Sequence, residues 1–262
     1  MDFQNILLER GDQVATLTLN RPDQMNPLDR ATVKEMLAAI RECDADDQVR
    51  IVVITGRGRG FSAGGDLKSY VKLYRDGPAF ERFVRDFQAM CTSIERSAKP
   101  FIAAVNGYCV AGGLELMLSC DLVFAADSAR IGDGHLNFGQ LPGGGGSQRL
   151  PRAIGALRAK QLLFSGELLP AGEAERIGLV NKVFPVDQLM ASTREYCAMM
   201  LTRSPLALKG AKYLVNQGLQ TDLHAGIELE VGYVYNYATT SHDAIEGLMA
   251  FAEKRRPQFK GT

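Results

Sequence analysis

Two glycine-containing segments place small residues where the backbone has to approach another group closely. The first reads FSAGGDLK from Phe61 to Lys68, and the second reads NGYCVAGGLEL from Asn106 to Leu116. Gly112 lies where a helix is expected to begin, so its N–H lacks an intrahelical partner and lies at the positive end of the helix dipole. A fixed N–H of this kind suits a developing oxyanion. Either loop alone is better explained as a tight turn or a close helix–sheet contact, but together, in this order, they are specific.

Glu115 carries a carboxylate on a helix that is otherwise apolar. It follows Gly112 by about one helical turn, so its side chain is expected beside the N–H of Gly112. Leu114 and Leu116 flank it, and a carboxylate among apolar side chains needs a partner or a function. A solvent-facing or capping glutamate is the alternative, and we favour an acid/base residue.

Alternating strand and helix patterns have to position these loops. Apolar runs predict strands at residues 14–19, 50–55, 101–105, 122–125 and 179–184. Helical spacing of apolar residues predicts helices near 28–40, 80–97 and 114–120. Strands joined through helices favour an α/β fold with a mainly parallel sheet covered by helices. Beyond about Met190 only helices are expected, and a terminal helical segment of this kind often packs on a neighbouring subunit.

The composition is that of a globular protein, with 46% hydrophobic and 23% charged residues among 262. The formal net charge is zero, which argues against long-range attraction to nucleic acid or a membrane. The start lacks a signal or transit pattern, and no apolar run reaches the roughly 20 residues of a membrane span. A cytoplasmic protein, or the mature form of an imported one, is therefore expected. The five scattered cysteines form no CxxC pair, so neither a disulfide framework nor a metal site is expected.

Further motifs join these two segments in an order that is typical of one family. They are PFIAAVNG (100–107), AGGLEL followed by CD (111–121), LPGGGGSQRL (141–150), GLVNKVFP (178–185) and FAEKRRPQFK (251–260). The sequence resembles the crotonase superfamily, the enoyl-CoA hydratase/isomerase family, over nearly its whole length. The resemblance implies an α/β spiral of ββα units at residues 1–198. It also implies a C-terminal helical trimerisation region at 199–262, which assembles homotrimers or hexamers.

The resemblance also implies a coenzyme A thioester as the substrate, with no further cofactor because CoA is part of the substrate. Gly65 and Gly112 match the residues whose N–H groups hold the thioester oxygen, and Glu115 matches the first of two acid/base glutamates. The matched CoA contacts are Ser62, Ala63, Asp66 and Lys68 in the first loop, and Phe251 and Lys254 near the C-terminus. The last two would reach the CoA of an adjacent subunit, whereas Arg255 and Arg256 fit a solvated tail equally well.

His135 stands where the family's second glutamate is expected, and this is the main departure from the pattern. Free Glu titrates near about 4.3 and free His near about 6.5, so the change alters which group holds a proton at neutral pH. The imidazole is an acid/base at neutral pH, and Asp133 is near enough to orient it. The alternative is a hydrogen-bonded structural histidine in a site that needs only Glu115.

An enoyl-CoA hydratase/isomerase-type reaction is the leading hypothesis, in which Gly65 and Gly112 polarise the thioester and Glu115 moves protons or activates water. With His135 in place of glutamate, an isomerase, a thioester hydrolase or a C–C cleaving enzyme also fits, as does a non-catalytic acyl-CoA-binding protein. The related aromatic dehalogenases need an Asp near Gly143 and a His near Gln88, and neither is present. The sequence does not fix the acyl group, whose pocket residues 70–96 are expected to shape.

Overall fold

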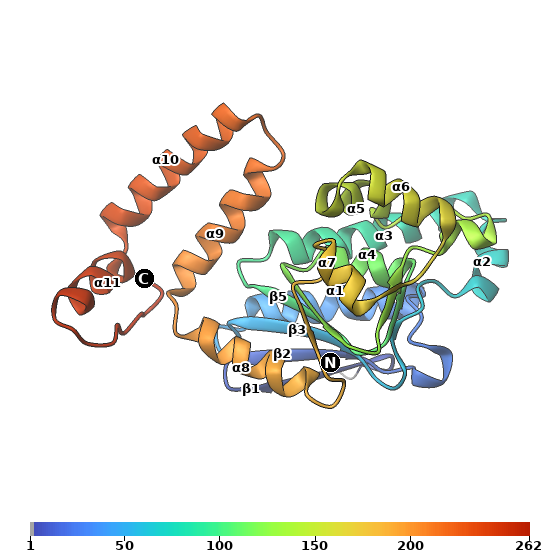
Figure 1. Ribbon diagram of the computed structural model, residues 1–262, viewed down its shortest axis with the longest axis horizontal. Coiled ribbons are helices and arrows are strands. Elements are labelled where there is room, and N and C mark those ends of the chain that lie inside the picture. The colour runs from blue at the N-terminus through green and yellow to red at the C-terminus, as the bar shows by residue number, and fades with distance from the viewer. Residues whose placement is uncertain (1–2) are drawn as a thin grey trace.

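The computed structural model describes residues 3–262, and parallel strands joined through helices form its larger part (Figure 1). Within these residues a six-stranded sheet has the order β1-β2-β3-β5-β7-β10 and a four-stranded sheet the order β4-β6-β8-β9. Pairings β1–β2 and β8–β9 are antiparallel, and the other neighbouring strands are parallel. The strands are β1 (Ile6–Gly11), β2 (Val14–Leu19), β3 (Ile51–Gly56), β4 (Gly60–Ser62), β5 (Phe101–Val105), β6 (Tyr108–Val110), β7 (Leu122–Ala126), β8 (Arg130–Gly132), β9 (Leu169–Pro170) and β10 (Lys182–Phe184).

Helices cover the sheets and then form the whole C-terminal part of the chain. They are α1 (Arg30–Ala45), α2 (Leu67–Leu73), α3 (Gly77–Arg96), α4 (Gly112–Leu118), α5 (Gly146–Ile154), α6 (Ala156–Ser165), α7 (Ala171–Arg176), α8 (Leu189–Leu201), α9 (Pro205–Gly218), α10 (Leu223–Thr240) and α11 (His242–Ala252), with 3-10 turns η1 (Pro22–Gln24) and η2 (His135–Phe138). The expected α/β class and the helices beyond residue 190 are confirmed. The strand expected at 179–184 is shorter, because Leu179 N–H bonds back to the Ala174 carbonyl at 2.8 Å and starts a turn.

The core lies between the larger sheet and the helices on it. All residues of β3 and β5 are buried, as expected for central parallel strands covered on both faces. α3 buries Phe83, Phe87, Met90 and Ile94, whose spacing puts them on one helical face. Asp76 begins this helix, because its carboxylate accepts the Ala79 N–H at 3.0 Å.

Glycines allow the chain to pass from the larger sheet to the smaller one within a few residues. A Cβ on Gly56 would lie 2.2 Å from the Gly60 carbonyl oxygen, and one on Gly107 would lie 2.1 Å from the Arg59 carbonyl oxygen. These turns connect β3 to β4 and β5 to β6. Because β4 and β6 are parallel neighbours, the loops that follow them leave the same edge of the smaller sheet.

The helices α9, α10 and α11 extend away from the sheets as a C-terminal arm (Figure 1). The expected division at 198/199 lies within α8, three residues before that helix ends. Between α8 and α9, Arg50 donates to the Leu201 carbonyl at 3.2 Å and to the Arg203 carbonyl at 2.8 Å. Lys212 ties the arm to the core through Asp121 Oδ2 at 2.8 Å. None of the helices within residues 3–262 is long and apolar enough to cross a membrane.

Candidate active site

The two glycine loops meet at the shared edge of β4 and β6. Gly64 has a φ of +88°, and a Cβ placed on it would lie 2.8 Å from the Gly112 nitrogen. The first loop is fixed from behind, because the Gly64 carbonyl accepts the Leu28 N–H at 2.8 Å. The loops are therefore packed backbone to backbone, as the sequence suggested and as only small residues permit.

The backbone at the start of α4 is strained. Ala111 has φ +52° and ψ −118°, a conformation that side chains rarely adopt, and this turn directs Gly112 into the first position of the helix. Within residues 3–262 neither Gly65 nor Gly112 has an acceptor for its N–H. Unpaired backbone donors beside a cavity are uncommon, and both remain available for a ligand oxygen.

A cavity of about 770 Å³, including its open mouth, contains these two glycines. Aromatic side chains from α2 and α3 form much of its wall, as expected for residues 70–96. Its lining includes Ala63, Gly65, Leu67, Tyr70, Tyr74, Phe80, Phe83, Val84, Phe87, Gly112, Glu115, His135, Phe138 and Leu141. The aromatic wall is apolar, and Glu115 and His135, whose side chains lie 3.9 Å apart, form a polar end of the cavity.

Glu115 is buried at this polar end, with 2% of its surface exposed. Its Oε1 accepts the N–H of Gly146, the first residue of α5, at 2.8 Å. The carboxylate therefore lies at the positive end of a second helix, which favours its charged form. Its other oxygen, Oε2, lies 3.9 Å from His135 Nε2.

His135 is held by Asp133. Its Nδ1 lies 2.9 Å from Asp133 Oδ1, which also accepts the His135 N–H at 3.1 Å. Asp133 is fully buried, and its Oδ2 has no hydrogen-bond partner within residues 3–262. A buried carboxylate with an unsatisfied oxygen favours a positive charge beside it, which an imidazolium supplies.

Glu115 and His135 have shifted pKa values for different reasons. Burial raises the pKa of Glu115 above its ordinary 4.5, and the N–H of Gly146 and the charge of His135 oppose this shift only in part. Burial opposes the charge on His135, but the hydrogen bond and charge of Asp133 outweigh it and raise the pKa of His135 above 6.5. A protonated His135, 3.9 Å away, in turn limits the rise in the pKa of Glu115, because a nearby positive charge favours the carboxylate.

The remaining sequence-predicted residues of the first loop have different surroundings. Ser62 is fully buried, donates to the Asn26 carbonyl at 2.8 Å and accepts the Gly64 N–H at 3.1 Å, so its side chain supports the loop rather than facing a ligand. Ala63 lines the cavity. Asp66 begins α2, where its carboxylate accepts the Lys68 N–H at 3.1 Å, and Lys68 is exposed.

Phe251 and Lys254 are not brought to the cavity of their own chain. Both are exposed, and Phe251 has 85% of its surface exposed. Phe251 belongs to α11, the last helix of the C-terminal arm (Figure 1). Arg255 beside them pairs with Glu246 at 2.6 Å, so it belongs to the arm rather than to a free basic tail. Neither side chain lines the cavity that contains Gly65 and Gly112.

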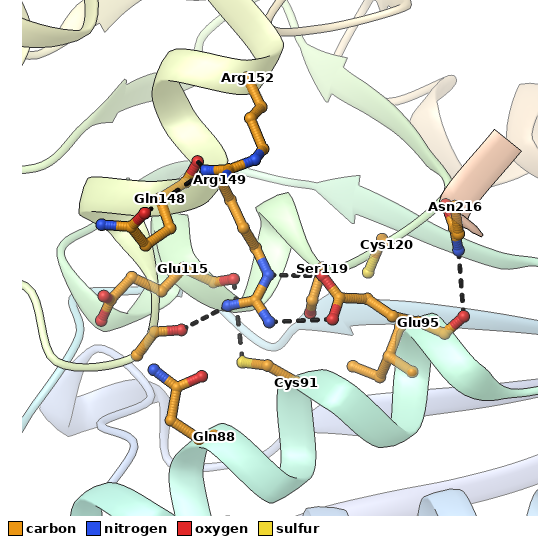
Figure 2. A network of polar contacts seen from close by, with 12 residues as sticks. Gln88, Cys91, Glu95, Glu115, Ser119, Cys120, Gln148, Arg149, Arg152 and Asn216 are labelled. Atoms are coloured by element: carbon orange, nitrogen blue, oxygen red, sulfur yellow. Dashed lines mark hydrogen bonds and ion pairs between the residues drawn. The ribbon is translucent and has the colours of Figure 1, made fainter. Parts of the chain in front are cut away.

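Gly146, Tyr70 and Arg149 are site residues to which the sequence analysis assigned no individual role. Gly146 acts through its backbone, and a Cβ on Gly65 would lie 2.1 Å from the Tyr70 hydroxyl, so that ring fills the space beside Gly65. Arg149 joins α3 to the glycine loop next to Glu115 (Figure 2). The LPGGGGSQRL motif contains Gly146 and Arg149, but only their long-range contacts reveal what they do.

Gln88 and Gly143, the two positions that dehalogenases would use, face each other, with Gln88 Nε2 donating to the Gly143 carbonyl at 2.8 Å.

A profile of the enoyl-CoA hydratase/isomerase family matches residues 9–262. The chain belongs to this family. It is an enzyme of the hydratase/isomerase type, and its two mainly parallel sheets with a C-terminal helical arm are the crotonase fold of that family.

Relatives of this enoyl-CoA hydratase/isomerase family member match it from end to end. A probable enoyl-CoA hydratase of Mycobacterium bovis is 39% identical, covering 99% of each chain. A crotonyl-CoA hydratase of Syntrophomonas wolfei is 38% identical, again covering 99% of each chain. The crystal structure of an enoyl-CoA hydratase from Bacillus anthracis has a TM-score of 0.94 at 36% identity, and covers 99% of this chain and 100% of that one.

Proposed function

We propose that this chain adds water across the C2–C3 double bond of a 2-enoyl-CoA thioester. The observation that carries the proposal is the separation of 3.9 Å between Glu115 Oε2 and His135 Nε2, in the cavity that also contains Gly65 and Gly112. This separation is too long for a direct hydrogen bond, yet one water oxygen is able to bond both groups. The relatives named enoyl-CoA and crotonyl-CoA hydratase support the same reaction.

The reaction uses only groups of the chain, the substrate and water. The thioester oxygen accepts the N–H groups of Gly65 and Gly112, which polarises the conjugated double bond. Glu115 takes a proton from water as the water oxygen bonds to C3, and the electron pair of the double bond moves onto the thioester oxygen. The His135 imidazolium then gives its proton to C2, and the enolate becomes a thioester again. Transfer of the proton from Glu115 to His135 restores the starting state.

Thioester hydrolysis is the second candidate, and the contact between Asp133 and His135 favours it. A histidine whose Nδ1 is held by a carboxylate has its Nε2 free to act as a base, as in hydrolases. Here neutral His135 would take a proton from a water that attacks the thioester carbon. The oxyanion would lie between the same two N–H groups, and free CoA would leave as its thiol.

To test the proposal, the purified protein is incubated with enoyl-CoA substrates that carry different acyl groups, starting with crotonyl-CoA. Hydration predicts loss of the enoyl absorbance and a CoA product heavier by one water, without free thiol. Glu115→Gln is expected to lower this rate by about 10²–10⁴-fold. Release of CoA thiol as the main product supports hydrolysis instead, and binding without turnover of any substrate overturns both reactions.

We also propose that the enzyme is a homotrimer, or a hexamer made of two trimers. The α10 helix buries no residue within its own chain, and one of its faces exposes Leu223, Ile227, Val231 and Val234. An apolar stripe at this spacing is typical of a helix that packs on another subunit. In such an assembly Phe251 and Lys254 would contact the CoA bound by a neighbouring subunit.

A further inference from the structure

Arg149 connects two elements through a single guanidinium group (Figure 2). Its Nε and Nη2 donate to the two carboxylate oxygens of Glu95 at 2.6 and 3.0 Å, and its Nη1 donates to the Gly144 carbonyl at 2.7 Å. The side chain is only 15% exposed. A two-pronged pair of this kind fixes the geometry of its partners as well as their charge.

The carbonyl that Arg149 holds belongs to the loop that binds Glu115. Two residues further on, the Gly146 N–H donates to Glu115 Oε1 at 2.8 Å. Gly145 lies between them with a φ of +104°, and a Cβ on it would lie 2.0 Å from Arg149 Nη1. The loop therefore wraps closely around the guanidinium, and the glycine leaves the space that the guanidinium occupies.

The other end of this connection is also anchored. Glu95 lies near the C-terminal end of α3, and its carbonyl accepts from Asn216 Nδ2 of α9 at 3.1 Å (Figure 2). Lys212 of the same helix donates to the neighbouring Ile94 carbonyl at 2.7 Å. The Glu95 carboxylate is thus a fixed point, against which Arg149 holds the loop.

We propose that Arg149 is a positioning residue for Glu115. By bridging Glu95 and the Gly144 carbonyl, it keeps the 144–146 loop where the Gly146 N–H directs the Glu115 carboxylate towards the substrate. Arg149 is not among the residues that line the cavity, so it acts without touching the substrate. The inference rests on the proposed function only in taking Glu115 as the base.

Glu95→Gln and Arg149→Lys separate geometry from charge. In Glu95→Gln, the new NH₂ group faces one N–H of the Arg149 guanidinium, so two donors meet. In Arg149→Lys, the ammonium lacks the planar, two-pronged geometry that bridges Glu95 and the Gly144 carbonyl. We expect both variants to lower kcat by about 10–100-fold with little change in KM. The acid limb of the pH–rate profile moves to higher pH, because the Gly146 bond lowers the pKa of Glu115 and its loss leaves the effect of burial less opposed. If Glu95 affected Glu115 only through its charge, Glu95→Gln would move the acid limb to lower pH. The substitution removes a negative charge and would therefore lower the pKa of Glu115.

Arg152→Met is the matched control, because Arg152 is an exposed arginine of the same helix that donates to the Gln148 carbonyl at 2.7 Å. It is expected to keep the wild-type kcat and acid limb. Hydrogen exchange of residues 143–148 is expected to accelerate in Glu95→Gln and Arg149→Lys, whichever reaction the enzyme catalyses, so a failure of the proposed function stays distinguishable. The proposal is overturned if hydrogen exchange of residues 143–148 is unchanged. It is also overturned if the acid limb stays in place in both variants, or if it moves to lower pH in Glu95→Gln.

Discussion

Glu115 and His135 share one cavity but have different neighbours. Glu115 is held by a backbone N–H at 2.8 Å, whereas His135 is held by the buried carboxylate of Asp133 at 2.9 Å. A neutral donor leaves the carboxylate free to take a proton, and a buried anion favours the charged imidazole. Two titratable groups with such different surroundings are suited to opposite roles, as a base and an acid.

The pH dependence of hydration follows from these shifts. Activity needs charged Glu115 and protonated His135, so it falls as pH drops through the raised pKa of Glu115, above 4.5, and as pH rises through the raised pKa of His135, above 6.5. We expect a bell-shaped profile of kcat/KM with both limbs above these ordinary values. His135→Gln is expected to abolish the alkaline limb and to lower the rate by about 10²–10⁴-fold. An activity that instead rises with pH through the His135 titration supports hydrolysis and contradicts this assignment.

Gly65 and Tyr70 are expected to be coupled. The backbone of Gly65 does not need glycine, but a Cβ on it would lie 2.1 Å from the Tyr70 hydroxyl. Gly65→Ala therefore pushes the Tyr70 ring into the cavity and is expected to lower kcat/KM about tenfold, within the range of couplings between residues in contact. Tyr70→Leu removes the collision, so the double variant should recover most of that loss relative to Tyr70→Leu alone. Additive losses in the double variant would show that Tyr70 is not the obstacle.

At the scale of elements, the turn from β6 into α4 sets the position of the Gly112 N–H. Ala111 lies there with φ +52° and ψ −118°. Glycine adopts such a conformation freely, whereas for other residues it costs about 1–3 kcal/mol. The packed loops on either side keep Ala111 in this conformation, which in turn places the Gly112 N–H at the cavity.

Ala111→Gly should separate stability from activity. Relief of strain offsets the greater flexibility of glycine in the unfolded chain, so the free energy of unfolding is expected to stay unchanged or to rise by up to about 2 kcal/mol. The kcat is expected to fall, by less than the roughly 10²–10³-fold that loss of an oxyanion donor costs. Denaturation curves and steady-state rates measure the two effects. The control Ala198→Gly, at an exposed position within α8, should lose about 0.5–1 kcal/mol of stability and no activity. A comparable loss of stability in Ala111→Gly would argue against strain.

Long elements of the fold could be predicted from the sequence, and short ones could not. The apolar face of α3 and the buried run of β3 produce clear periodicities over several residues. β4, β6 and β8 have three residues each, too few to show a period, so the second sheet was not predicted from patterns. Within the site, Glu115 follows from local spacing, but its partner Gly146 is distant in the chain and depends on tertiary packing.

At the scale of the whole molecule, the C-terminal arm has more apolar surface than its own chain covers. Phe251 is 85% exposed and Leu248 is 74% exposed on α11, the helix that follows α10 and its apolar stripe. Exposed apolar surface of this extent is expected to be buried between subunits. The assembly then decides whether Lys254 is a solvated side chain or part of a neighbouring CoA site.

The role of Lys254 can be tested together with the assembly. If its ammonium contacts CoA across a subunit boundary, Lys254→Ala should raise KM by up to about fivefold without changing kcat. An exposed ion pair contributes up to about 1 kcal/mol, which corresponds to this change in affinity. Arg256→Ala, at an exposed neighbour, should change neither constant.

Ile227→Glu, in the exposed stripe of α10, is expected to dissociate the oligomer in analytical ultracentrifugation, whereas Ala225→Glu on another face of the same helix should not. Once the subunits are apart, Lys254 has no neighbouring CoA to contact, so Lys254→Ala should have no further effect on KM in the Ile227→Glu background. A KM increase of the same size in the dissociated protein would place the Lys254 contact within its own chain and overturn the cross-subunit assignment.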